Sequence, residues 1–387
     1  MVLSSLRRQV PPALVAAALL AAAPAVAQWP GLTFPPDGDN QFSSVTQGIG
    51  PVRVTLQYNS PDVHSPTGED RRGKIWGTSV AHYGMANLGF GTCGDQCPWR
   101  GGANENTVFT TSHDVKIQGQ PLPAGSYGLH FLAGPEEWTV IFSKNSTSWG
   151  SFTYDAKEDA LRVKAKPEKS EYNEWLTYEF IDRKPDHATV ALKWEDLQVP
   201  LTISVDNVAG LYIDQIRRDL RSSPGFNWQN WNAAAQYALQ NKTNLEEALT
   251  WAEHAATPSL GGQETFATLT SLAELQAANG KADDSQKTLE RALNHPTAGP
   301  VAIHLYGRQL LAQGKNEEAM RVFELNAKKH PNIWPVHVGL SRGHAALGRT
   351  KEALAEARLA LAQAPDENNR QGIEALIKQL EAAGSSR

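Results

Sequence analysis

Two stretches of this sequence read GKNEEA at 314–319 and GRTKEA at 348–353, and they lie 34 residues apart. Pro331 and Pro365 repeat with the same step, and Gly280 stands one step before the first stretch. A glycine followed by a polar residue and a helical apolar pattern is typical of one helix ending and the next beginning. The C-terminal half is therefore predicted to be an array of paired helices.

Single positions within the repeat have physical roles. The glycine is expected to end the first helix of a pair, and Asn316 or Thr350 to cap the second. Ala319 is small, so the paired helices can approach closely, and Phe323 supplies bulk one turn later. Gly307 fits the small position of the preceding first helix.

The period and these positions resemble tetratricopeptide repeats. The resemblance covers residues 227–387, with two clear units, a weaker unit around Gly280 and a divergent unit at Trp228–Ala256. Glu367–Ala383 reads as a polar capping helix, which such arrays need for solubility. Because these arrays present a groove lined by the first helices, the resemblance implies a protein or peptide partner.

Residues 28–206 show a different period. Val52, Val54, Leu56 and Tyr58 alternate with polar residues, as in a half-buried strand. Turn residues separate further short runs of this kind, at 107–111, 115–118, 127–132, 138–142, 161–165, 175–181, 189–194 and 199–205. We expect an antiparallel β-sandwich, or a barrel-like closure of the same strands.

Helical spacing returns immediately after the β region. Leu211, Ile213, Ile216 and Leu220 follow it, and the pattern ends near Pro224. We therefore predict a linker helix within 207–226 and a helical-repeat domain at 227–387. The fold class is a multidomain chain, β then α.

The first 27 residues resemble a targeting segment. Arg7 and Arg8 precede an apolar run at 13–23, and residues 25–27 read AVA, an A-x-A cleavage site. The run is too short to cross a bilayer. Residues 1–27 are predicted to be a signal peptide, the protein to be periplasmic or secreted, and the mature chain to have no transmembrane span.

Composition excludes some partners and chemistries. The net charge is −5, and without Arg7 and Arg8 it becomes more negative. With no basic block, we expect no nucleic-acid partner. The sequence lacks a G-x-S-x-G elbow, an H-E-x-x-H motif, a P-loop and a dinucleotide fingerprint. We expect no cofactor, and the catalytic residues stay unknown.

Cys93 and Cys97 are the only cysteines. In an oxidising compartment, two neighbouring cysteines favour a disulfide. The alternative is a metal pair with His82 as a third ligand. Zinc sites usually add a second ligand pair, and none is visible in the sequence.

The richest polar stretch, WRGGANENT at 99–107, follows the cysteine loop. Arg100 offers a planar fork for carboxylates, Asn104 a donor and an acceptor, and Glu105 a charge. His130 lies on the strand after a Pro-Ala-Gly turn. If the two stretches pair, these four residues form one polar cluster that binds a ligand. The alternative is a structural Arg100–Glu105 ion pair with His130 as a strand residue.

Tryptophans offer a second kind of candidate. An exposed indole suits a sugar ring, and Trp149, in the Ser-Trp-Gly stretch, is the least strand-like. Trp175 and Trp194 sit at regular strand positions and are expected in the core.

The β region carries a set of ordered motifs: WRGGANENT at 99–107, LPAGSYGLH at 122–130, WTVIF at 138–142, WGSFTY at 149–154 and DALRV at 159–163. Together these motifs resemble the bacterial family known as domain of unknown function 2911. The resemblance covers Ser44–Val205. It implies an exported protein, often with helices of the tetratricopeptide kind behind the β domain, and implies no activity or catalytic residues. Ala86–Pro98 departs from the family pattern as an insertion, which weakens a family-wide role for the cysteines.

Two function classes follow. The first is a binding or scaffold protein of the cell envelope, with a ligand-binding β domain and a protein-binding helical array. The second is a hydrolase or metal-binding protein that acts on an envelope saccharide or peptide. The second requires the four polar residues to converge in one open pocket.

Overall fold

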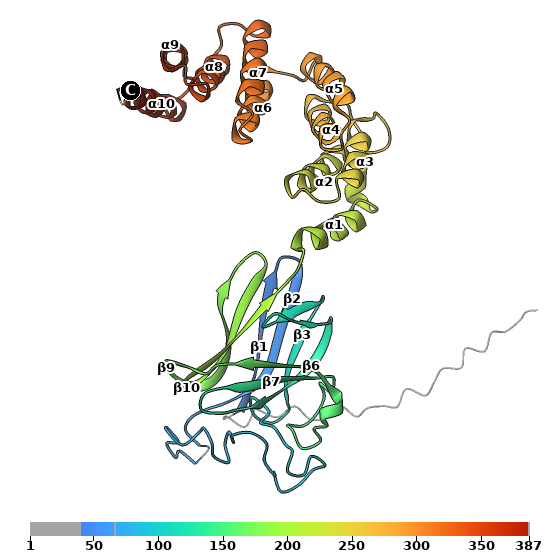
Figure 1. Cartoon of the computed structure of the whole chain (residues 1–387), viewed down its shortest axis with the longest axis vertical. Helices are drawn as coiled ribbons and strands as arrows, with labels where there is room; N and C mark the ends of the chain where they lie inside the picture. The colour runs from blue at the N-terminus through green and yellow to red at the C-terminus, as the bar shows by residue number, and fades with distance from the viewer. Residues whose placement is uncertain (1–39, 66, 386–387) are drawn as a thin grey trace, which may run out of the picture.

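The computed structural model describes residues 40–65 and 67–385, so the predicted signal peptide, 1–27, lies outside the described residues. An antiparallel β domain comes first, and an array of helices curves away from it (Figure 1). The predicted fold class, a β-sandwich followed by helical hairpins, is confirmed.

The described strands form two antiparallel sheets, one of six strands in the order β1-β2-β3-β6-β7-β8 and one of four in the order β5-β4-β10-β9. Their bounds are β1 (Asn40–Ile49), β2 (Val52–Pro61), β3 (Thr107–Thr111), β4 (Val115–Ile117), β5 (Gln120–Leu122), β6 (Gly125–Leu132), β7 (Trp138–Ser143), β8 (Asp159–Ala165), β9 (Glu168–Arg183) and β10 (His187–Ser204). Side chains of both sheets share one hydrophobic core. The predicted alternation in β2 is confirmed, since Val52, Val54 and Leu56 are buried.

Two strands differ from the prediction. The sequence of β1 is largely polar and gave no apolar alternation, yet it pairs with β2 over its whole length. Pairing with β2 determines the register of β1, so this tertiary contact outweighs the weak strand pattern in the sequence of β1. The predicted runs 189–194 and 199–205 form the single strand β10. Glu195 adopts φ 56° beside a register shift, so a bulge bends the strand without ending it.

The expected burial of two tryptophans is half right. Trp194 is 1% exposed, but Trp175 is 59% exposed. Leu176 and Tyr178 on β9 point into the core, so their neighbour Trp175 must lie on the outer face of the sheet. Trp149 is exposed, as expected.

Helix α1 (Val208–Asp219) joins the two regions, and the short turn η2 (Ser223–Phe226) follows it. Val208 and Leu211 of α1 pack against the β core. Ile213 and Ile216, further along the helix, belong to the hydrophobic cluster of the array. One short helix thus contacts both cores.

The array consists of helix pairs with one helix at the end (Figure 1). Their bounds are α2 (Trp228–Gln240), α3 (Leu245–Ala256), α4 (Phe266–Ala278), α5 (Ala282–Asn294), α6 (Pro300–Ala312), α7 (Asn316–Lys329), α8 (Trp334–Ala346), α9 (Thr350–Ala362) and α10 (Glu367–Ser385). First helices touch along the array, α2 with α4 and α6 with α8. Within the described residues, no helix is both long enough and apolar enough to cross a membrane.

The small and large positions of the repeat interlock as predicted. A Cβ at Gly307 would lie 2.3 Å from Cε1 of Phe323, so only glycine leaves room for this ring. Phe323 is 1% exposed and also packs against Gly339 of α8. The alternation of glycine and phenylalanine therefore connects α6, α7 and α8.

The predicted caps are wrong. Gly314 has φ 75° and ends α6, as expected, but the next amide, of Lys315, already donates to the carbonyl of Leu310. This tight turn makes Lys315 the residue before α7, so Asn316 is already helical. The Asn316 side chain instead donates to the carbonyl of Ala346. Thr350 likewise starts α9 without capping it.

Candidate functional site

Arg100 lies after the cysteine loop, and three contacts fix its side chain. Its Nη1 donates to the backbone carbonyl of Asn104 over 2.8 Å. Its guanidinium carbon lies 4.9 Å from the centroid of the Phe152 ring. Gly150 packs so closely that a Cβ there would lie 2.6 Å from Arg100 Cζ. Burial lowers the pKa of Arg100, yet no described carboxylate forms an ion pair with it.

His130 lies near Arg100 but is sealed in the interior. It is 1% exposed, and its Nδ1 shares a 2.8 Å hydrogen bond with the hydroxyl of Ser151, which is equally buried. Burial lowers the pKa of His130 to about 4, and the charge of Arg100 adds to this effect. The imidazole is therefore neutral at pH 7. Because substrate cannot reach a side chain this buried, the arrangement is a structural one.

Glu105 does not join the predicted cluster. Its carboxylate accepts from Nδ2 of Asn59 over 2.9 Å. It lines a separate hollow with Phe42 and Tyr58, whereas Arg100 and Asn104 line a cavity beside the cysteine loop. Asn104 has φ 56°, so the chain turns sharply before Glu105 and sends the two side chains to different faces. The single four-residue site and the Arg100–Glu105 ion pair are both wrong.

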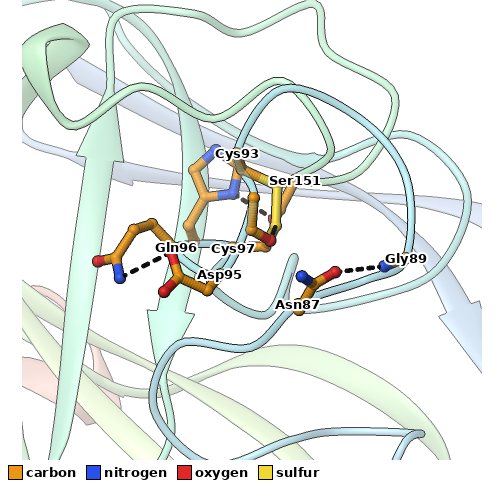
Figure 2. Close-up of a disulfide and its surroundings, with 9 residues drawn as sticks. Asn87, Gly89, Cys93, Asp95, Gln96, Cys97 and Ser151 are labelled. Carbon is orange, nitrogen blue, oxygen red and sulfur yellow. Dashed lines mark hydrogen bonds between the residues drawn. A yellow bond between two sulfur atoms is a disulfide. The ribbon is translucent and has the colours of Figure 1, made fainter.

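Cys93 and Cys97 are joined by a disulfide with a Cα–Cα distance of 5.2 Å (Figure 2). The loop that carries it docks on the segment after β7, since the amides of Thr92 and Cys93 both donate to the carbonyl of Phe152. The disulfide leaves no thiolate for the alternative metal site with His82. In the described part of the chain, no group of three His, Cys, Asp or Glu side chains could hold a metal ion.

A second cluster lies on the first helices of the array, and our sequence analysis did not identify it. Glu274, Arg308 and Arg342 occupy equivalent positions on α4, α6 and α8, at steps of 34 residues. Nε2 of Gln309 donates to the Glu274 carboxylate over 3.0 Å. Neither arginine forms an ion pair within the described residues, and Nε of Arg342 is buried without a partner.

His304 completes this cluster one helical turn before Arg308. It is 6% exposed, and its Nδ1 has no described hydrogen-bond partner. Burial lowers the pKa of His304 to about 4, and Arg308 and Arg342 lower it further. Burial and the charge of Arg308 also lower the pKa of Arg342. The two guanidinium groups therefore form a positive site with which no carboxylate of the described chain is paired, since Glu274 is bonded to Gln309 instead. The 34-residue period could have identified this site from the sequence, because Arg308 and Arg342 occupy the same position in successive repeats.

Comparison with protein families supports the resemblance of the β domain. Residues 40–203 match the family described as "Protein of unknown function (DUF2911)". A comparison with curated proteins finds no significant match.

Solved structures that resemble the chain are tetratricopeptide-like proteins. A putative kinesin light chain with nearly identical TPR-like repeats, from Podospora anserina, is 20% identical over 41% of this chain and 87% of its own, with a TM-score of 0.29. A thermophilic TPR protein of Thermus thermophilus is 16% identical over 45% of this chain and 91% of its own, with a TM-score of 0.31. YrrB, titled a TPR protein with an unusual peptide-binding site, is 17% identical over 44% of this chain and 89% of its own, with a TM-score of 0.26.

Proposed function

We propose that this protein is an exported binding and scaffold protein of the cell envelope. Its helical array binds a protein or peptide partner, and its β domain binds a small ligand. The observation that carries the proposal is the pair Arg308 and Arg342, two neighbouring arginines on first helices without an acidic partner among the described residues.

The chemistry of this pair selects the partner. Two guanidinium groups at repeat-equivalent positions offer several donors to carboxylates, and a charge-assisted hydrogen bond is worth about 1.5–3 kcal/mol. The neutral His304 beside them adds no further charge. An acidic segment of a partner, or a C-terminal carboxylate, satisfies both guanidinium groups. A basic segment would add repulsion.

Fluorescence polarisation of the full mature chain tests this. A labelled short polyglutamate peptide is expected to bind, and a polylysine peptide of equal length is not. Arg342→Gln should weaken polyglutamate binding roughly tenfold or more. Arg358→Gln is the matched control, since Arg358 lies on the second helix α9 and is largely exposed. Equal binding of the two peptides, or equal losses in the two variants, would reject the proposal.

Export rests on the segment 1–27 and on the disulfide. We expect the protein isolated from its own cell envelope to begin at Gln28 and to hold no free thiol. Intact mass with and without reductant measures both features. An intact Met1, or two free thiols in the exported protein, contradicts export through a signal peptide into an oxidising compartment.

A further inference from the structure

The β domain contains a cavity of about 330 Å³ beside the cysteine loop. Its walls come from three parts of the chain: the end of β2 at Pro61 with the next residue, Asp62, the loop that carries His82, and the stretch from Pro98 to Asn104. Trp194 of β10 also lines it. The cavity thus contains two of the four residues singled out in the sequence, Arg100 and Asn104.

Among the described residues that line the cavity, Arg100 is a cation without an acidic partner. Arg71 also lines it, but Arg71 donates to the backbone carbonyls of Val63 and Asp62 and lies 3.9 Å from the Asp62 carboxylate. Arg100 uses only Nη1, toward Asn104, so its Nε and Nη2 have no partner within the described chain. The contacts with Phe152 and Gly150 hold this free edge in a fixed position.

Two further polar groups in the wall are unsatisfied. Trp194 is 1% exposed, and its indole Nε1 is buried without an acceptor among the residues that the structure describes. Nδ1 of His82 is also buried and has no partner in that part of the chain. Burial lowers the pKa of His82, so at pH 7 its ring is neutral and adds no second charge. Both nitrogens are buried, so a ligand in the cavity can reach Arg100 but not these two atoms.

We propose that this cavity binds the carboxylate of a small hydroxylated organic acid, with Nε and Nη2 of Arg100 as its two donors. The Nε–Nη2 edge of arginine matches the two oxygens of a carboxylate. The cavity offers one unpaired positive charge, which a monocarboxylate neutralises. A phosphate dianion would leave one negative charge uncompensated in the same cavity as Asp62. Ser79 and Asn104, which also line the cavity, offer hydrogen-bonding groups to the hydroxyls of the ligand.

This inference names the ligand class of the proposed β-domain function and rests on it, but it does not depend on peptide binding by the array. Isothermal titration of the full mature chain with glucuronate, glucose and glucose 6-phosphate tests it. Glucuronate is expected to bind, and glucose should bind at least tenfold more weakly. Glucose 6-phosphate binding as tightly as glucuronate would overturn the choice of a monocarboxylate.

Variants separate recognition from folding. Arg100→Gln should weaken glucuronate binding at least tenfold, whereas Arg53→Gln, an exposed arginine on β2, should leave it unchanged. Ser79→Ala removes an exposed hydroxyl from the cavity wall, and should weaken binding several-fold. Arg308→Gln must leave glucuronate binding intact, because a loss there would place the ligand on the array. Unchanged binding in both Arg100→Gln and Ser79→Ala would reject the proposal.

Discussion

The β domain and the helical array bury apolar surface in opposite ways. In the β domain, both sheets contribute to one core that centres on large rings, with Trp76 in edge contact with Trp99, Trp138 and Trp194. In the array, small residues let helices approach, and the apolar residues divide into two clusters, the second beginning at Val338. A core built from residues that are distant in sequence should unfold as one cooperative unit, whereas an array, in which each repeat contacts its neighbours, should unfold locally.

The largest expected effect tests the single β core. Trp138 is 1% exposed, and its Nε1 donates to the carbonyl of Gly134 over 2.9 Å. Trp138→Ala should cost about 3–5 kcal/mol, because it removes a large ring and leaves an unpaired carbonyl. Hydrogen exchange by mass spectrometry should show β peptides losing protection while those of α4–α9 keep it.

Trp149→Ala is the control, since Trp149 is 57% exposed and should change protection little. Equal loss of protection in β domain and array after Trp138→Ala would show that α1 couples them into one cooperative unit. The proposed division near residue 206 would then be wrong.

The same contrast explains what the sequence could predict. Gly314 and Phe323 act through contacts within one repeat or with the next, so a local pattern at a fixed period revealed their roles. Trp175 and β1 were misjudged because their environment depends on strands distant in sequence. Arg100 and Glu105 are close in sequence, yet the backbone turn at Asn104 separates them. The spacing of residues in a sequence does not show in which direction such a turn sends the following side chains.

Both regions should lose stability at low pH, because each buries a neutral histidine. His130 in the β domain and His304 in the array are both buried, with pKa values lowered to about 4. In the unfolded chain these histidines take up a proton near pH 6.5, whereas in the folded protein they do so only near pH 4. The free energy of unfolding of each region should therefore fall between about pH 6.5 and 4, and these histidines should lower it little further below pH 4. Protonation of each histidine should lower the free energy of unfolding by roughly 3 kcal/mol in total.

Denaturant melts at several pH values, followed by region-resolved hydrogen exchange, measure this loss. His130→Gln should flatten the pH dependence of the β domain only, and His304→Gln that of the array only, so each variant is the control for the other. Stability that is constant between pH 6.5 and 4 in the unmodified protein would contradict the buried neutral state of both rings.

The smallest effect tests whether close approach, rather than helix propensity, sets the packing of the array. Gly307 and Gly372 both lie in helices, where alanine is intrinsically better by about 0.5–1 kcal/mol. At Gly372 a Cβ meets nothing within 4 Å, so Gly372→Ala should gain this amount. At Gly307 the Cβ would strike the Phe323 ring, and overpacking of this kind costs about 1–3 kcal/mol. Gly307→Ala should therefore destabilise the array despite the higher helix propensity of alanine.

Phe323→Leu combined with Gly307→Ala should recover part of the lost stability, since the added methyl group then has room. If both alanine variants are stabilised equally in thermal melts followed by helical circular dichroism, the interlock of Gly307 with Phe323 contributes nothing to the array.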